Sequence, residues 1–141
     1  MGLKIIDQNW GVFLTNKRHR PVDQLLLIAP FVKFNAISRL INSLKPNTVK
    51  LVTRYSLEDF CSRVSDISAL EYVLQNGGEL RGIRNLHSKL YIYDQKTVFI
   101  TSANLTEAAL FRGNHEFGIQ TSDTNTIATC RGYFEKLWSD G

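Results

Sequence analysis

Four polar side chains stand close to two short apolar segments in the second half of the chain: His87, Lys89, Ser102 and Asn104. The amine, the hydroxyl and the amide can donate hydrogen bonds to the oxygens of a phosphate group. The imidazole is left to attack as a nucleophile or to move a proton. Because a histidine and a lysine in an apolar hairpin are costly without an anion or another partner, we interpret the four as a phosphate site rather than as frayed strand ends in water.

The geometry of this site depends on how the two segments pair. Residues 88–94 and 97–102 are expected to be strands of a hairpin, in which residues two apart share a face. A loop with an even number of residues places His87 opposite Asn104 and Lys89 opposite Ser102, with facing Cβ atoms about 5 Å apart. An odd loop sends one pair to the other face. The hypothesis of a shared site therefore assumes an even loop.

In order and spacing the residues resemble the signature of the phospholipase D superfamily, His-x-Lys-x4-Asp-x6-small-Ser-x-Asn. The signature is met by His87, Lys89, Asp94, Ser102 and Asn104. The resemblance implies an α/β fold of the phospholipase D type over residues 1–141, with one copy of the motif.

Two further positions bear on this resemblance. The family has an acidic residue about ten positions beyond the motif, which hydrogen-bonds the histidine, and Glu116 fits that place. Thr101 departs from the family, which usually has glycine there. Because the side chain of Thr101 suits a strand, we expect the backbone path to be kept.

The resemblance also implies a mechanism. Members of this superfamily cleave phosphodiesters without a metal ion or other cofactor: one motif histidine attacks phosphorus, and a second protonates the leaving oxygen. Neither His19 nor His115 is followed at the second position by lysine, so this chain supplies one such histidine. We therefore expect a homodimer with a site shared across a two-fold axis.

By the same resemblance each motif residue has a role. His87 is the nucleophile in one subunit and the acid and base in the other, while Lys89 and Asn104 hold the non-bridging phosphate oxygens. Ser102 supports them, and Glu116 sets the tautomer of His87 and stabilises its charged form. Asp94 lies a hairpin's length from His87, and we expect it to serve turn or interface structure rather than chemistry.

A nuclease is the favoured function, with DNA favoured over RNA as the substrate. Lys and Arg number 17 against 13 Asp and Glu, which gives a net charge of +4 and mildly favours a polyanion. The alternatives are a nucleic-acid-binding or dimerisation module of a larger assembly, a phosphodiesterase acting on lipids or other diesters, and an inactive relative.

Other titratable residues carry weaker signals. The basic run 17–20 is interpreted as a solvated loop, with a phosphate-contacting arm as the alternative, and His19 as an exposed member of it. His115 is expected to be an ordinary surface or core histidine. Arg81 and Arg84 either extend a phosphate track or lie at a solvated strand edge.

The elements that position the site follow from hydrophobic periodicity. Strands are predicted at 24–29, 48–53, 79–83, 88–94, 97–102 and 115–120. Helices are predicted at 35–44, within 56–76, at 105–111 and at 124–138, the last capped by Asp123. Ile67, Leu70, Val73 and Leu74 are expected to line one helix face. The pattern indicates an α/β fold with a mixed sheet flanked by helices on both faces.

Composition bounds these interpretations. With 43% hydrophobic and 21% charged residues, the chain has the make-up of a globular domain, which excludes disorder, collagen and coiled coil as global descriptions. No apolar stretch approaches the length that spans a bilayer, and no secretory signal is found, so we expect a cytoplasmic protein without a membrane partner. Cys61 and Cys130 lie far apart and are interpreted as ordinary thiols.

Overall fold

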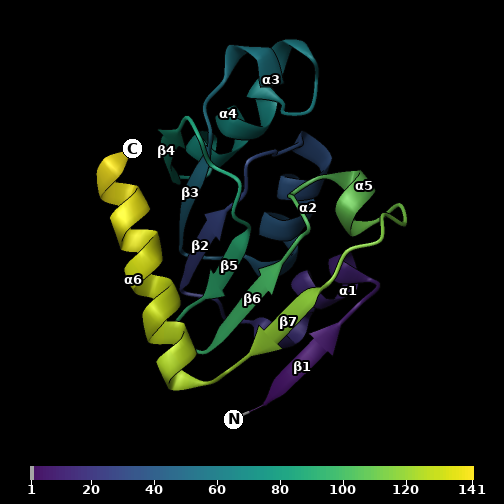
Figure 1. Cartoon of the computed structure of the whole chain (residues 1–141), viewed down its shortest axis with the longest axis vertical. Coiled ribbons are helices and arrows are strands. Elements are labelled where there is room, and N and C mark those ends of the chain that lie inside the picture. The colour runs from purple at the N-terminus through teal and green to yellow at the C-terminus, as the bar shows by residue number, and fades with distance from the viewer. Residues whose placement is uncertain (1) are drawn as a thin grey trace.

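A mixed sheet of seven strands lies at the centre of the computed structural model, which describes residues 2–141 (Figure 1). The strand order is β1-β7-β6-β5-β2-β3-β4. The strands are β1 (Leu3–Ile6), β2 (Gln24–Ile28), β3 (Thr48–Arg54), β4 (Glu79–Ile83), β5 (Leu90–Tyr93), β6 (Thr97–Thr101) and β7 (Gly118–Thr121). The helices are α1 (Trp10–Leu14), α2 (Phe34–Leu44), α3 (Leu57–Cys61), α4 (Ile67–Gln75), α5 (Glu107–Leu110) and α6 (Thr124–Asp140), with a 3₁₀ turn η1 (Lys17–His19).

Strand direction determines which connections meet. Strands β2, β3 and β4 run parallel, whereas β5, β6, β7 and β1 pair antiparallel with their neighbours. Consequently β2, β3, β4 and β6 end, and β5 and β7 begin, at one end of the sheet, which we call the upper end after its place in Figure 1. All the segments that carry the predicted site lie there.

Helices cover both faces of the sheet, which confirms the predicted fold class. Helices α1, α2, α4 and α5 pack over one core, and α6 packs over the other. Helix α2 buries Ile37, Leu40 and Leu44 at the predicted spacing. The side chain of Asp123 caps α6 by accepting a hydrogen bond from the Thr126 amide at 2.9 Å. No helix within residues 2–141 is long and apolar enough to cross a membrane.

Several elements differ from the predictions, among them helix α1 and turn η1, which were not predicted. Strand β1 was not anticipated, since three of its four residues are exposed and the segment carries almost no burial signal. Helix α4 has the predicted position, but Ile67 and Leu74 are exposed. Its buried side chains are Ala69 and Val73, so the apolar face is narrower than the sequence suggested.

The predicted register of the β5–β6 hairpin is wrong. Tyr93 pairs with Thr97, so the loop contains the three residues 94–96, an odd number. Asp94 takes the left-handed backbone conformation, with φ of 57°, at the start of this turn. Pairing ends at Leu90 and Ile100, so the residues expected to face one another lie beyond the paired strands. Any proximity between these residues must therefore come from a feature other than strand pairing in the hairpin.

Candidate active site

Three neighbouring connections at the upper end carry the predicted site residues. His87 and Lys89 precede β5, Ser102 and Asn104 follow β6, and Glu116 precedes β7. Because β5, β6 and β7 lie side by side, the sheet brings these connections to one place. The order of the strands therefore brings the predicted site residues near one another, which the register of the β5–β6 hairpin alone does not do.

A bend after β6 sets the course of the segment from Ser102 to Asn104. Thr101 Oγ1 accepts a hydrogen bond from the Ala103 amide at 3.0 Å. The buried Tyr91 hydroxyl donates to the Ala103 carbonyl oxygen at 2.5 Å. Held on both sides, Ala103 is buried and Ser102 is exposed. The bend therefore positions Ser102 together with the hydrogen bond that the Ser102 amide donates to the Phe117 carbonyl oxygen at 3.1 Å.

Thr101, the position that departs from the signature, remains part of β6 as expected. It pairs with Gly118 on β7. A Cβ atom on Gly118 would lie 2.1 Å from the Ile100 carbonyl oxygen and 2.7 Å from the Cα of Thr101. Glycine at 118 is therefore what allows β6 and β7 to approach so closely beside the site.

Ser102 and Glu116 form the central contact of the site. The serine hydroxyl donates to Glu116 Oε1 at 2.6 Å and accepts from the Phe117 amide at 3.0 Å. Asn114 Nδ2 donates to Glu116 Oε2 at 3.4 Å. The hydroxyl hydrogen that we expected to reach a phosphate is thus directed to Glu116, which makes Ser102 a supporting residue.

Lys89 is partly buried next to this pair. Burial lowers the pKa of its amine, the negative charge of Glu116 raises that pKa, and the positive charge of Arg54 lowers it. Among residues 2–141 Lys89 forms no ion pair. Its ammonium group is therefore a partly desolvated cation available to an anionic ligand.

Asn104 and His87 complete the set. Asn104 Oδ1 accepts a hydrogen bond from the Phe31 amide at 3.1 Å, which leaves the amide nitrogen of the side chain as its donor. His87 is exposed, and in the described part of the chain it makes no hydrogen bond to Glu116. The expected contact between these two residues stays a prediction.

Together these residues can bind an anion and act on it. Lys89 and Asn104 offer donors, and the exposed imidazole of His87 lies in the same set of connections. Within residues 2–141 no group of three or more His, Cys, Asp or Glu side chains could hold a metal ion.

Asp94 lies at the opposite end of β5, as predicted. Its carboxylate accepts hydrogen bonds from the backbone amides of Asp23 at 2.9 Å and Gln24 at 2.7 Å. These amides open β2, the neighbour of β5. Asp94 therefore ties the hairpin turn to the start of the central strand.

Several weaker predictions are also resolved. His19 is not an exposed member of its basic run: it is half-buried, and its ring packs edge-on against Tyr93 and Phe99 with centroid distances of 4.9 Å and 5.8 Å. His115 is exposed, as expected for a surface histidine. The guanidinium of Arg81 lies 4.2 Å from the centroid of the Trp138 ring, which gives it a packing role at the strand edge.

Sequence reasoning missed Arg54 and Phe31. Arg54 ends β3, and its Nε and Nη2 donate to the two carboxylate oxygens of buried Asp59 at 2.6 Å and 2.7 Å. Its guanidinium lies 4.7 Å from the centroid of the Phe31 ring. Both residues lie at the carboxyl ends of β2 and β3, which the structure shows to be parallel neighbours, an arrangement that hydrophobic periodicity does not specify.

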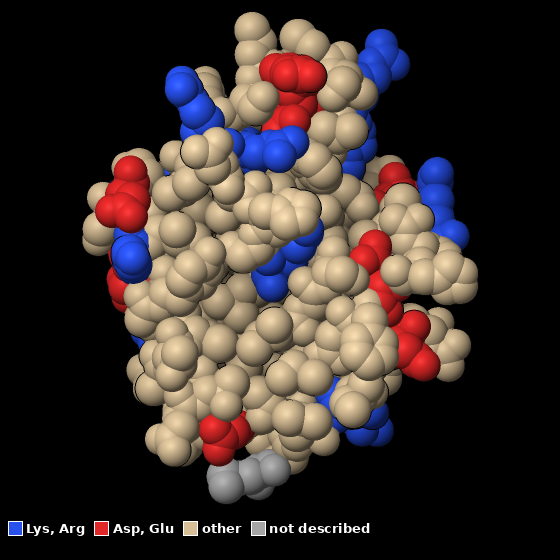
Figure 2. All heavy atoms as spheres, viewed as in Figure 1, with Lys and Arg blue, Asp and Glu red and all other residues tan. Residues whose placement is uncertain are grey.

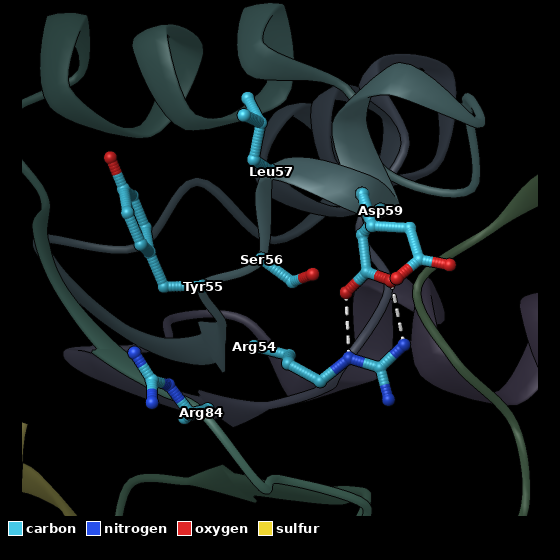
Figure 3. Close-up of a pocket in the computed structure, with 7 residues that line it drawn as sticks. Arg54, Tyr55, Ser56, Leu57, Asp59 and Arg84 are labelled. Carbon is cyan, nitrogen blue, oxygen red and sulfur yellow. Dashed lines mark hydrogen bonds and ion pairs between the residues drawn. The ribbon is translucent and has the colours of Figure 1, made fainter.

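Arg54 also lines a hollow of about 700 Å³ next to the site (Figure 3). The other lining residues come from the connection after β3, from the start of α3 and from the segment after β4: Tyr55, Ser56, Leu57, Glu58, Asp59 and Arg84.

Comparison with known proteins agrees with this fold. A family model described as "Cardiolipin synthase, PLD-like domain" matches residues 21–138. NucT from Helicobacter pylori is 18% identical, with a TM-score of 0.77 over 98% of this chain and 96% of that chain. The phospholipase D family member Nuc from Salmonella typhimurium is 22% identical, with a TM-score of 0.77 over 98% of this chain and 94% of that chain.

A larger protein shares the fold as well. TrmBL2, described as an archaeal chromatin protein with a novel mode of DNA binding, is 18% identical with a TM-score of 0.64 over 99% of this chain and 53% of that chain. A comparison with curated protein sequences finds no match. At these identities the solved structures establish a shared fold.

Proposed function

The chain belongs to the family of phospholipase D-like domains, and from this premise we propose that it is a metal-independent phosphodiesterase that cleaves nucleic acid in a homodimeric active site. One observation carries the proposal: the connections that hold His87, Lys89, Ser102, Asn104 and Glu116 all meet at the upper end, where Ser102 is bonded to Glu116.

The reaction has two displacement steps. A nitrogen lone pair of His87 attacks phosphorus, the bond from phosphorus to the leaving oxygen breaks, and that oxygen takes a proton from His87 of the partner subunit. The partner's His87, now neutral, removes a proton from water, whose oxygen attacks phosphorus. The phosphorus–nitrogen bond breaks, which releases a phosphomonoester and restores both histidines.

The other residues stabilise charge in these steps. Lys89 and the Asn104 amide nitrogen hold the non-bridging oxygens, on which negative charge grows in the transition state. Glu116 orients His87 and favours its charged form, while Ser102 keeps the carboxylate in place through the 2.6 Å hydrogen bond.

An uncovered part of the sheet supports the proposed dimer. Helix α6 packs against β4, β5 and β6 and leaves the same face of β7 and β1 open. Leu3, Ile5, Ile100 and Phe117 lie exposed on that face, and Ile100 and Phe117 border the segments that carry Ser102 and Glu116. Figure 2, which views this face, shows few charged side chains over β6, β7 and β1. A second copy seated here would cover apolar surface and bring a second His87 toward the first.

Nucleic acid is the proposed substrate because the chain is basic, with a net charge of +4, and because Lys89, Arg54 and Arg84 gather near the upper end. DNA binding by TrmBL2, a protein of the same fold, favours DNA over RNA.

Digestion of plasmid DNA and of RNA in excess EDTA tests this function. We expect cleavage by the wild-type chain and by His115→Ala, and a loss of at least about a hundredfold in His87→Ala. Cleavage that depends on added magnesium would overturn the phosphohistidine mechanism. Binding of DNA without cleavage would identify a binding module, and cleavage of bis(nitrophenyl) phosphate alone would point to other diesters.

A further inference from the structure

The hollow beside Arg54 is open to solvent and adjoins the proposed catalytic residues (Figure 3). Arg54 lies over the Phe31 ring, and the amide of Phe31 is bonded to Asn104. The charge of Arg54 also acts on Lys89. A phosphodiester held by Lys89 and Asn104 would therefore have its neighbouring nucleotide within reach of the hollow.

Two large apolar side chains stand exposed at this hollow. Tyr55 is 69% exposed and Leu57 is 77% exposed. The backbone and Cβ of Tyr55 are held in place, because its amide donates to the Ile83 carbonyl oxygen at 3.3 Å and its Cβ packs over Gly82. The ring meets Phe60 in a T-shaped contact with centroids 6.1 Å apart. In Figure 3 the Tyr55 ring and the Arg84 guanidinium lie on the same side of the hollow, with the tyrosine hydroxyl directed away from Arg84.

The two arginines that line the hollow differ in whether they are already paired with a carboxylate. The guanidinium of Arg54 is bound at two atoms by Asp59, which keeps Arg54 in place. Arg84 is exposed and forms no ion pair in the described part of the chain. The acidic Glu58 also lines the hollow and limits its net positive charge. Arg84 is therefore the cation best placed to meet a phosphate group here.

We propose that this hollow is a subsite for an unpaired nucleotide next to the scissile phosphodiester, with Tyr55 stacking on the base and Arg84 contacting the adjoining phosphate. The proposal rests on the proposed nuclease function and adds a substrate preference to it. A ring can stack on a base only when the face of that base is free, and in a duplex both faces are covered by neighbouring pairs. The subsite thus favours single-stranded nucleic acid over duplex.

Binding is measured in the His87→Ala background, so that cleavage does not interfere, by fluorescence anisotropy with a labelled single-stranded DNA and its duplex. Tyr55→Ala is expected to weaken single-strand binding about tenfold, and Tyr55→Trp to preserve it. Arg84→Gln should weaken binding and reduce its salt dependence by about one counterion. Leu74→Ala, an exposed apolar residue outside the hollow, is the control and should leave binding unchanged.

Activity separates this inference from the proposed function. In an otherwise wild-type chain, Tyr55→Ala should raise KM for single-stranded DNA in EDTA and leave kcat nearly unchanged, because Tyr55 binds the neighbouring nucleotide and does not touch the reacting phosphorus. Equal single-strand binding by Tyr55→Ala and its parent, or equal binding of duplex and single strand, overturns the subsite. Failure of the wild-type chain to cleave any diester in EDTA overturns the nuclease proposal, whatever the binding data show.

Discussion

Glu116 accepts a hydrogen bond from Ser102 across the β6–β7 pair, and its charge offsets part of the lowering that burial imposes on the pKa of the neighbouring Lys89 amine. Glu116→Gln keeps an acceptor for Ser102 but removes the charge. Lys89 must be protonated to hold phosphate, and loss of the Glu116 charge lowers its pKa further. We therefore expect the alkaline limb of the kcat/KM profile to shift to lower pH in this variant. The activity at its optimum should also drop, by roughly 10–100-fold. A pH–rate profile with diester substrate checks both, and an unshifted alkaline limb would contradict the role of the charge.

Two buried tyrosines give a matched pair of variants. The Tyr91 hydroxyl donates to Ala103 beside the site, whereas the Tyr93 hydroxyl donates to Leu14 at 2.7 Å on another element. Each change to phenylalanine leaves a buried carbonyl oxygen without its donor and should cost about 1–3 kcal/mol in the free energy of unfolding. Only Tyr91→Phe should also lower kcat, because it frees the segment that carries Ser102 and Asn104. Denaturant unfolding and steady-state kinetics on both variants decide the point. Equal kinetics in the two variants would show that the bend does not position the site.

A site shared by two subunits has a signature in mixing experiments. When equal amounts of wild-type and His87→Ala chains exchange freely, about one quarter of the dimers hold two intact histidines. Activity should therefore fall to about a quarter of the value for the same total amount of wild-type chain. A value near one half would mean that each subunit works alone.

The exposed apolar face of β1 and β7 should hold the dimer together. Ile5→Arg places a charge on this face, where Ile5 is 62% exposed. We expect the variant to sediment as a monomer, to remain folded by circular dichroism and to lose activity. Val12→Arg is the control, since Val12 is 65% exposed but lies on α1, away from this face. A dimeric Ile5→Arg protein would place the interface elsewhere.

His19 should make stability depend on pH. Burial lowers the pKa of its imidazole, and a hydrogen bond to the Phe13 carbonyl oxygen offsets part of that shift. The unfolded chain therefore binds the proton more readily, so the free energy of unfolding should decrease as pH falls below the unfolded value of 6.5. Urea unfolding at about pH 8 and pH 5 measures this loss. His19→Phe should reduce it, and His115→Phe, at an exposed position outside the aromatic cluster, serves as the control.

Much of the fold could be predicted because its signals are local. Helix α2 is marked by apolar residues at helical spacing, and α6 by Asp123, whose side chain caps it. Strand β1 was not predicted because an exposed edge strand shows little contrast between buried and exposed positions. Arg54 escaped because its proximity to Lys89 depends on the order of strands in the sheet, which periodicity does not specify.

The hairpin shows a different limit. Residues 94–96 contain no glycine, and the turn is odd because Asp94 adopts a positive φ while its carboxylate accepts hydrogen bonds from the amides of Asp23 and Gln24 at the start of β2. Those amides are distant in sequence, so the parity of the loop could not be inferred from the hairpin itself. The candidate site residues still lie in neighbouring connections, since the bend at Thr101–Ala103 directs Ser102 independently of that parity.

Asp94 belongs to the signature but has a structural position. It shares the motif with His87 yet lies at the far end of the same strand, where it anchors the first amides of β2. Part of the motif thus serves assembly of the scaffold, and the part that carries His87 belongs to the proposed active site. A homologue could retain the aspartate for architectural reasons after its histidine has been replaced, so possession of the acidic position alone is no guide to whether such a chain still turns over substrate.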